Sequence, residues 1–90
     1  MPTYKFHVKG KVQGVNFRAS TREQAIKAGL TGYVRNLNNG DVEIVVNGTD
    51  NQIDELLEWC KKGPELAEVR GLVAEKLKEM KFGNFEVIRS

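Results

Sequence analysis

The chain has 90 residues, 40% of them hydrophobic and 29% charged, which is typical of a single globular domain with one core. Its formal net charge is only +2 and no run of lysines or arginines occurs, so we expect no nucleic-acid partner. No segment has the roughly 20 apolar residues of a membrane span, and the N-terminus lacks the apolar region of a signal peptide, so we expect a cytoplasmic, one-domain protein over residues 1–90 without a membrane partner.

The first predicted element is a strand over residues 4–12. Apolar and charged residues alternate along it, which indicates one buried face. A helix is predicted over residues 20–29, because Ser20 stands three residues before Glu23, the spacing of a capping box. Thr21 is a second candidate for the cap of this helix.

The rest of the chain predicts a hairpin, a second helix and two further extended segments. The sequence Asn38-Asn39-Gly40 favours a hairpin turn, because Asn and Gly tolerate positive φ angles. The predicted elements are strands over 31–37 and 41–47, a helix over 50–62 capped by Thr49 or Asp50 and ended by Gly63-Pro64, an extended segment over 66–77 and a short strand over 85–88.

This order, β-α-β-β-α-β with a short extra strand at the C-terminal end, predicts a ferredoxin-like α+β fold. We expect an antiparallel-rich sheet with both helices on one face, because each short helix must bury its apolar face to be stable. The residues expected in the core are Phe6, Val8, Ile26, Val42, Ile44, Val46, Leu56, Leu57, Val69 and Val73.

The turn over residues 13–18 is a candidate anion site. It joins a strand to a helix, with Gly14 at its centre and Arg18 at its far edge. Backbone N–H groups at such a turn point along the helix dipole, and an arginine fork matches phosphate oxygens. Val15 and Phe17 are placed to hold the turn on the core. The alternative interpretation is a tight connection with a surface arginine.

A second candidate is Asn36, which ends a strand just before the hairpin turn. Its amide can accept a hydrogen bond from water and donate one to a phosphate oxygen, so it can orient a nucleophile. An asparagine at this place can equally serve only to satisfy the hairpin backbone.

The two segments together resemble the acylphosphatase family. The first reads Gly10-Lys11-Val12-Gln13-Gly14-Val15-Asn16-Phe17-Arg18, and the second begins Gly32-Tyr33-Val34-Arg35-Asn36 and continues through Gly40 and Val42. The resemblance covers nearly the whole chain, including its length and its order of elements.

The resemblance implies hydrolysis of small acyl phosphates, with Arg18 binding the phosphate and Asn36 positioning the attacking water. It implies that the residues before Arg18 bind the phosphate chiefly through backbone N–H groups, and that Thr21 has a supporting role. We expect no cofactor and no metal, and a monomer. The residues implied in phosphate binding are Gln13, Gly14, Val15, Asn16, Phe17 and Arg18. Many family members carry a different residue at the position of Asn16, and we expect this to change the degree of activity only.

Acyl phosphates suit so small a set of residues. Their leaving group is a carboxylate, which is stable at neutral pH and needs no general acid. A loose phosphoryl-transfer transition state asks mainly for charge neutralisation and alignment. An arginine with backbone N–H groups supplies the first, and an asparagine supplies the second.

The alternative function is a non-catalytic phosphate- or carbamoyl-phosphate-binding module of the same fold. An RNA-binding sheet is disfavoured because the strand over 41–47 has no aromatic residue, and a metal carrier is disfavoured because Cys60 is the only cysteine. We interpret Cys60 as a core residue and His7 as an exposed residue of the sheet. The acidic residues of the second helix, Asp50, Asp54, Glu55 and Glu58, are interpreted as a solvated face.

Overall fold

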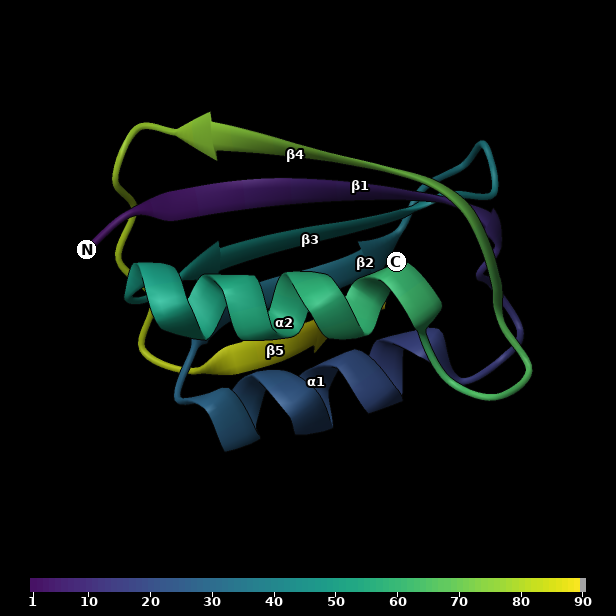
Figure 1. Ribbon diagram of the computed structural model, residues 1–90, viewed down its shortest axis with the longest axis horizontal. Coiled ribbons are helices and arrows are strands. Elements are labelled where there is room, and N and C mark those ends of the chain that lie inside the picture. The colour runs from purple at the N-terminus through teal and green to yellow at the C-terminus, as the bar shows by residue number, and fades with distance from the viewer. Residues whose placement is uncertain (90) are drawn as a thin grey trace.

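The structure is a computed structural model and describes residues 1–89. Five strands form one sheet of order β4-β1-β3-β2-β5, and two helices lie together on one face of it (Figure 1). The elements are β1 (Thr3–Lys11), α1 (Phe17–Ala28), β2 (Thr31–Asn36), β3 (Val42–Asn47), α2 (Asp50–Lys62), β4 (Glu68–Leu77) and β5 (Phe85–Ile88). The predicted ferredoxin-like α+β sandwich, with its short final strand, is confirmed. No helix among residues 1–89 is long and apolar enough to cross a membrane.

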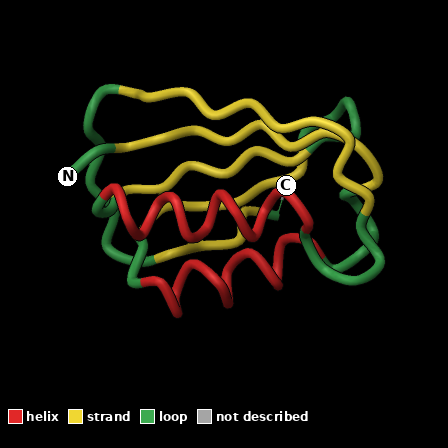
Figure 2. The backbone as a smooth tube through the Cα atoms, viewed as in Figure 1, coloured by secondary structure: helices red, strands yellow, loops and turns green. Residues whose placement is uncertain are grey.

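The two layers are plain in Figure 2, where the helices lie in front of the strands. All neighbouring strands pair antiparallel except β2 and β5, which are parallel. Ile44 of β3 is in register with Phe6 of β1 and with Val34 of β2, and all three side chains are fully buried. Because side chains alternate between the two faces of a strand, this register defines the face that the helices cover.

The second helix forms as its sequence predicts. Its buried side chains are Ile53, Leu56 and Cys60, which recur at helical spacing and face the sheet. Cys60 is fully buried in the core, and burial raises the pKa of its thiol, so it stays a neutral packing residue.

The first helix begins earlier than its sequence predicts, so the prediction of a start at Ser20 is wrong. Helix α1 begins at Phe17, and the backbone N–H of Ser20 already donates to the carbonyl oxygen of Asn16. Thr21 is not a cap either, because its buried hydroxyl donates to the carbonyl oxygen of Phe17 at 2.8 Å. A left-handed turn at Asn16, which the spacing of Ser20 and Glu23 does not reveal, sets the start of the helix.

Two residues expected in the core lie on the surface. The buried residues of α1 are Phe17, Thr21 and Ala25, so the next residue, Ile26, points away and is 51% exposed. Val73 pairs with His7 on the sheet face opposite the helices and is 59% exposed. The core does include the other expected residues, with Leu57 and Val69 packed at its margin.

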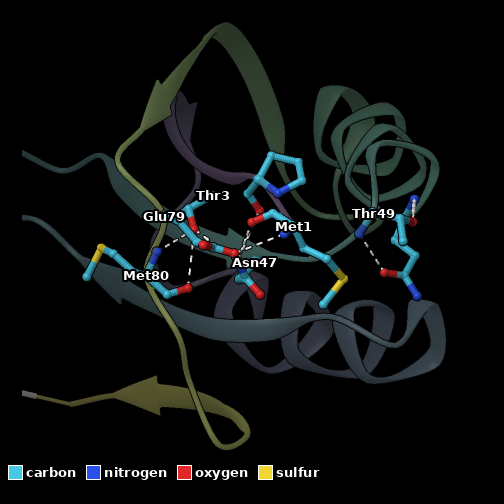
Figure 3. A network of polar contacts seen from close by, with 8 residues as sticks. Met1, Thr3, Asn47, Thr49, Glu79 and Met80 are labelled. Carbon is cyan, nitrogen blue, oxygen red and sulfur yellow. Dashed lines mark hydrogen bonds and ion pairs between the residues drawn. The ribbon is translucent and has the colours of Figure 1, made fainter.

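At one end of the sheet, called the closed end, the first residues of the chain are hydrogen-bonded to Asn47 at the end of β3 (Figure 3). The side-chain amide of Asn47 donates to the carbonyl oxygens of Met1 and Pro2 and to the hydroxyl of Thr3, at 3.1 to 3.2 Å. The same hydroxyl accepts from the backbone N–H of Met80 at 2.9 Å. Thr3 opens β1 and the 13–18 turn follows its end, so this network lies at the opposite end of the sheet from the turn.

Candidate active site

A small cavity lies where β1 passes into α1. It has a volume of about 120 Å³. Residues from three separate parts of the chain line it: the 13–18 turn, the end of β2 and the segment after β5. The lining residues include Gln13, Gly14, Asn16, Phe17, Arg18, Asn36 and Arg89.

The backbone of the turn contains two residues with positive φ angles. Gly14 has φ 73° and Asn16 has φ 63°, whereas Val15 between them has no positive φ. An alternating sign of φ is a feature of anion-binding turns, in which successive N–H groups face one side. Asn16 is the only non-glycine residue with a positive φ in residues 1–89, and asparagine tolerates that region better than most side chains.

Buried side chains hold the turn in place. Val15 and Phe17 are both in the core, as expected, and the ring of Phe17 packs on Trp59 with centroids 5.6 Å apart. The side-chain nitrogen of Gln13 donates to the carbonyl oxygens of Leu37 and Asp41, each at 2.8 Å. The side-chain nitrogen of Gln13 therefore ties the turn to the hairpin and is not a free donor for a ligand.

The N-terminus of α1 is left open toward the cavity. Its cap residue, Asn16, makes no side-chain hydrogen bond to the helix, and the first turn contains no acidic residue. The first N–H groups of a helix have no partner within the helix and carry partial positive charge. An anion in the cavity is thus favoured by the backbone itself.

Arg18 stands in the first turn of this helix and lines the cavity. Its guanidinium makes one weak hydrogen bond, to the carbonyl oxygen of Ile88 at 3.4 Å. It forms no ion pair with a carboxylate of residues 1–89. Most of its donors are therefore available for an anion.

Asn36 reaches the same cavity from the sheet. It ends β2 two residues after Val34, so its side chain lies on the helix-covered face. Its side-chain oxygen is buried and has no hydrogen-bond partner among residues 1–89. A buried oxygen without a partner is rare in folded proteins and calls for a donor, such as a water molecule or a ligand.

The remaining candidates of the sequence analysis lie elsewhere. Thr21 does not line the cavity; its hydrogen bond to Phe17 braces the first turn of α1. His7 was expected to be exposed but is half-buried on the uncovered sheet face, with Nε2 2.5 Å from Oδ2 of Asp41. Within residues 1–89, no three His, Cys, Asp or Glu side chains are grouped so as to hold a metal ion.

Sequence reasoning missed the second cationic residue of the cavity, Arg89. It follows directly after β5 and lines the cavity together with Arg18 and Asn36. Neither recognised segment extends to this part of the chain. The only signal was a basic residue next to a predicted strand, and nothing local says which elements that strand will join.

Comparison with known proteins shows the family of the chain. The family model described as Acylphosphatase matches residues 4–87. An acylphosphatase of Vibrio parahaemolyticus is 45% identical over 84 residues, which are 93% of each chain. An acylphosphatase of Vibrio cholerae is 56% identical over 66 residues, covering 73% of this chain and 72% of the relative.

Similarity in three dimensions is as extensive. The crystal structure of acylphosphatase from Bacillus subtilis superimposes with a TM-score of 0.95 and 30% sequence identity, over 99% of this chain and 100% of the other. The family match includes the 13–18 turn and Asn36, and the chain is a hydrolase that belongs to the acylphosphatase family.

Proposed function

We propose that this protein hydrolyses the carboxyl–phosphate anhydride of small acyl phosphates in the cavity between Arg18 and Asn36. Acyl phosphate hydrolysis in general follows from its family. The observation that carries the assignment of residues is the buried, unpartnered oxygen of Asn36, which shares one small cavity with the guanidinium of Arg18. The two groups are complementary: one accepts a hydrogen bond from water, and the other attracts phosphoryl oxygens.

The phosphoryl group is held by charge and by backbone donors. Arg18 offers a planar fork of N–H groups, and the turn with the open helix end offers N–H groups from Gly14 to Phe17. These donors are in position before the substrate arrives, so they stabilise developing negative charge without rearranging. Gln13 contributes by fixing the turn to the hairpin.

Asn36 aligns the water. Its side-chain oxygen accepts a hydrogen bond from the water, whose oxygen then attacks phosphorus on the side opposite the acyl oxygen. The P–O bond to the acyl group breaks, and its electron pair leaves with the carboxylate. The proton of the water passes to a phosphoryl oxygen or to solvent, because a loose transition state needs little help from a base.

Turnover of benzoyl phosphate, followed by the loss of its ultraviolet absorbance, tests this proposal. We expect hydrolysis to continue in the presence of a chelator. An Arg18→Ala preparation made in the same way controls for contaminating phosphatases. Absence of turnover in a folded wild-type preparation that still binds inorganic phosphate would instead indicate the non-catalytic phosphate-binding module.

A further inference from the structure

Arg89 lies where the phosphate cavity meets two neighbouring hollows. A second hollow of about 220 Å³ is lined by Arg18, Asn36, Ile88 and Arg89. A third, a groove of about 550 Å³, runs between α1 and β5 and also includes Arg89. Figure 1 shows these two elements side by side. Arg89 is therefore shared by the phosphate cavity and by both spaces into which a bound molecule can extend.

The phosphate cavity is the smallest of these three spaces. At about 120 Å³, it is smaller than the two hollows beside it, of about 220 and 550 Å³. We therefore take the acyl half to lie in one of these larger hollows. Both of them are lined by Arg89, which among residues 1–89 is the one charged residue besides Arg18 that lines the phosphate cavity.

The charged residues that line the groove determine where a second negative charge, on the acyl half of the substrate, can bind favourably. Arg89 is exposed and forms no ion pair with a carboxylate of residues 1–89. Farther along the groove lie Glu23 and Glu86, both exposed. The second cationic residue of the groove, Arg22, donates its Nε hydrogen to the carbonyl oxygen of Phe85. A carboxylate a few bonds from the reacting phosphorus meets Arg89, whereas one at the end of a long chain meets the glutamates.

We propose that Arg89 binds a carboxylate on the acyl half of the substrate and thereby favours acyl phosphates of short dicarboxylic acids. This inference rests on the proposed function, because it takes the phosphoryl group to lie between Arg18 and Asn36. The guanidinium acts on the part of the substrate that does not react. Its contribution is therefore to affinity and selectivity, through a charge-assisted fork that fits a carboxylate.

The test uses two phosphonate analogues of succinyl phosphate in which a methylene group replaces the bridging oxygen, so that neither is hydrolysed. One analogue ends in a carboxylate and the other in a carboxamide of the same shape. By calorimetric titration at low ionic strength, we expect the wild type to bind the carboxylate form about three- to tenfold more tightly, as for a partly exposed bidentate pair. Added salt should reduce this ratio.

Substitution assigns the preference to one residue. Arg89→Gln should remove the ratio between the two analogues. Arg70→Gln removes the same charge from β4, at the opposite edge of the sheet, and should leave the ratio unchanged. In kinetics, Arg89→Gln should lower kcat/KM for succinyl phosphate relative to acetyl phosphate by a similar factor, through KM rather than kcat.

The outcomes separate this inference from the proposed function. Equal affinities for the two analogues in the wild type, with normal binding of inorganic phosphate, overturn the role of Arg89 and leave the phosphate cavity standing. A ratio that persists in Arg89→Gln also overturns it. Failure of the wild type to bind phosphate and both analogues overturns the phosphate cavity, and the role of Arg89 with it.

Discussion

The N-termini of the two helices are built in opposite ways. At α2, the hydroxyl of Thr49 accepts from the backbone N–H of Gln52, and the side chain of Gln52 accepts from the backbone N–H of Thr49 (Figure 3). Asp50 adds a negative charge in the first turn. At α1, Asn16 makes no such hydrogen bond and no acidic residue follows.

This difference separates a helix end that serves stability from one that serves binding. A capping box satisfies the free N–H groups with the protein's own side chains, so no donor is left for a ligand. The N-terminus of α1 lacks the stabilisation of a cap, and its backbone N–H groups remain available at the cavity of Arg18 and Asn36. Its shape is maintained instead by the burial of Val15 and Phe17 and by the hydrogen bonds of Gln13.

The largest expected effect comes from removing the charge at the open end. Arg18→Ala should reduce turnover of benzoyl phosphate by about 10³-fold or more and abolish binding of inorganic phosphate, because the main cation of the cavity is lost.

Asn36→Ala should reduce turnover by about 10²- to 10³-fold but leave phosphate binding nearly intact, since Asn36 acts on the water. Phosphate titrations followed by amide NMR measure the binding. Equal loss of binding in both variants would contradict the division of roles.

A carboxylate placed at the open end should make α1 resemble α2. Asn16→Asp keeps the size of the side chain and adds a negative charge beside the first N–H groups. We expect phosphate affinity to fall about 10- to 100-fold through repulsion, and the free energy of unfolding to rise by about 0.3–1 kcal/mol through the helix dipole. Asn16→Gly, which retains the left-handed conformation, is the control. Unchanged phosphate affinity in the Asp variant would show that the end of α1 does not bind the anion.

Release of the turn from the hairpin should have an intermediate effect. Gln13→Leu removes two hydrogen bonds, although the carbonyl oxygens of Leu37 and Asp41 each keep a backbone N–H donor. At about 0.5–1.5 kcal/mol for each hydrogen bond, we expect a loss of about 1–3 kcal/mol in stability. Turnover should fall about tenfold, because a displaced loop is poorly aligned. Asn39→Ala is the matched control, because Asn39 supports the same hairpin through the N–H of Asp41 without contacting the turn. Equal losses of turnover in both variants would point to general disturbance of the hairpin.

Opening the capped helix should affect stability alone. Thr49→Ala removes the acceptor for the N–H of Gln52 and should lower the free energy of unfolding by about 1 kcal/mol. Turnover should be unchanged, since Thr49 lies near the closed end of the sheet, away from the cavity. Chemical denaturation and the benzoyl phosphate assay measure the two quantities on the same preparation. A loss of activity without a loss of stability would break the distinction between the helix ends.

The smallest effect concerns pH and lies away from both helix ends. Burial on its own would raise the pKa of Glu43, but its hydrogen bond with Arg35 at 2.7 Å and the charge of Arg35 outweigh it and hold the pKa of Glu43 below its usual value. A carboxyl with a lowered pKa stabilises the fold above its unfolded pKa, and this contribution is lost as the pH falls through the folded value. Stability should therefore decline from about pH 5 to pH 3. Glu43→Gln should make the decline shallower; an unchanged slope would assign it to other carboxylates.

Much of the fold could be predicted because its signals are local. Alternation around Phe6 and Val8 predicts a strand, and Asn38-Asn39-Gly40 predicts the hairpin turn that follows Asn36. The failures at Ile26 and Val73 have one cause. Both residues fit an apolar pattern, but the choice of the face that is covered depends on how the layers pack.

The sequence by itself determined the order of the elements, the family and the two segments that meet at the cavity, because short-range spacing and turn chemistry are enough for these. Only the tertiary structure decided where α1 begins, what the side chain of Gln13 contacts and that the oxygen of Asn36 stays unpartnered. It also brought Arg89, which follows the last strand, into the same cavity as Arg18, which follows the first. Each of these depends on contacts between residues far apart in sequence, which the parallel pairing of β2 with β5 and the packing of α1 on the sheet create.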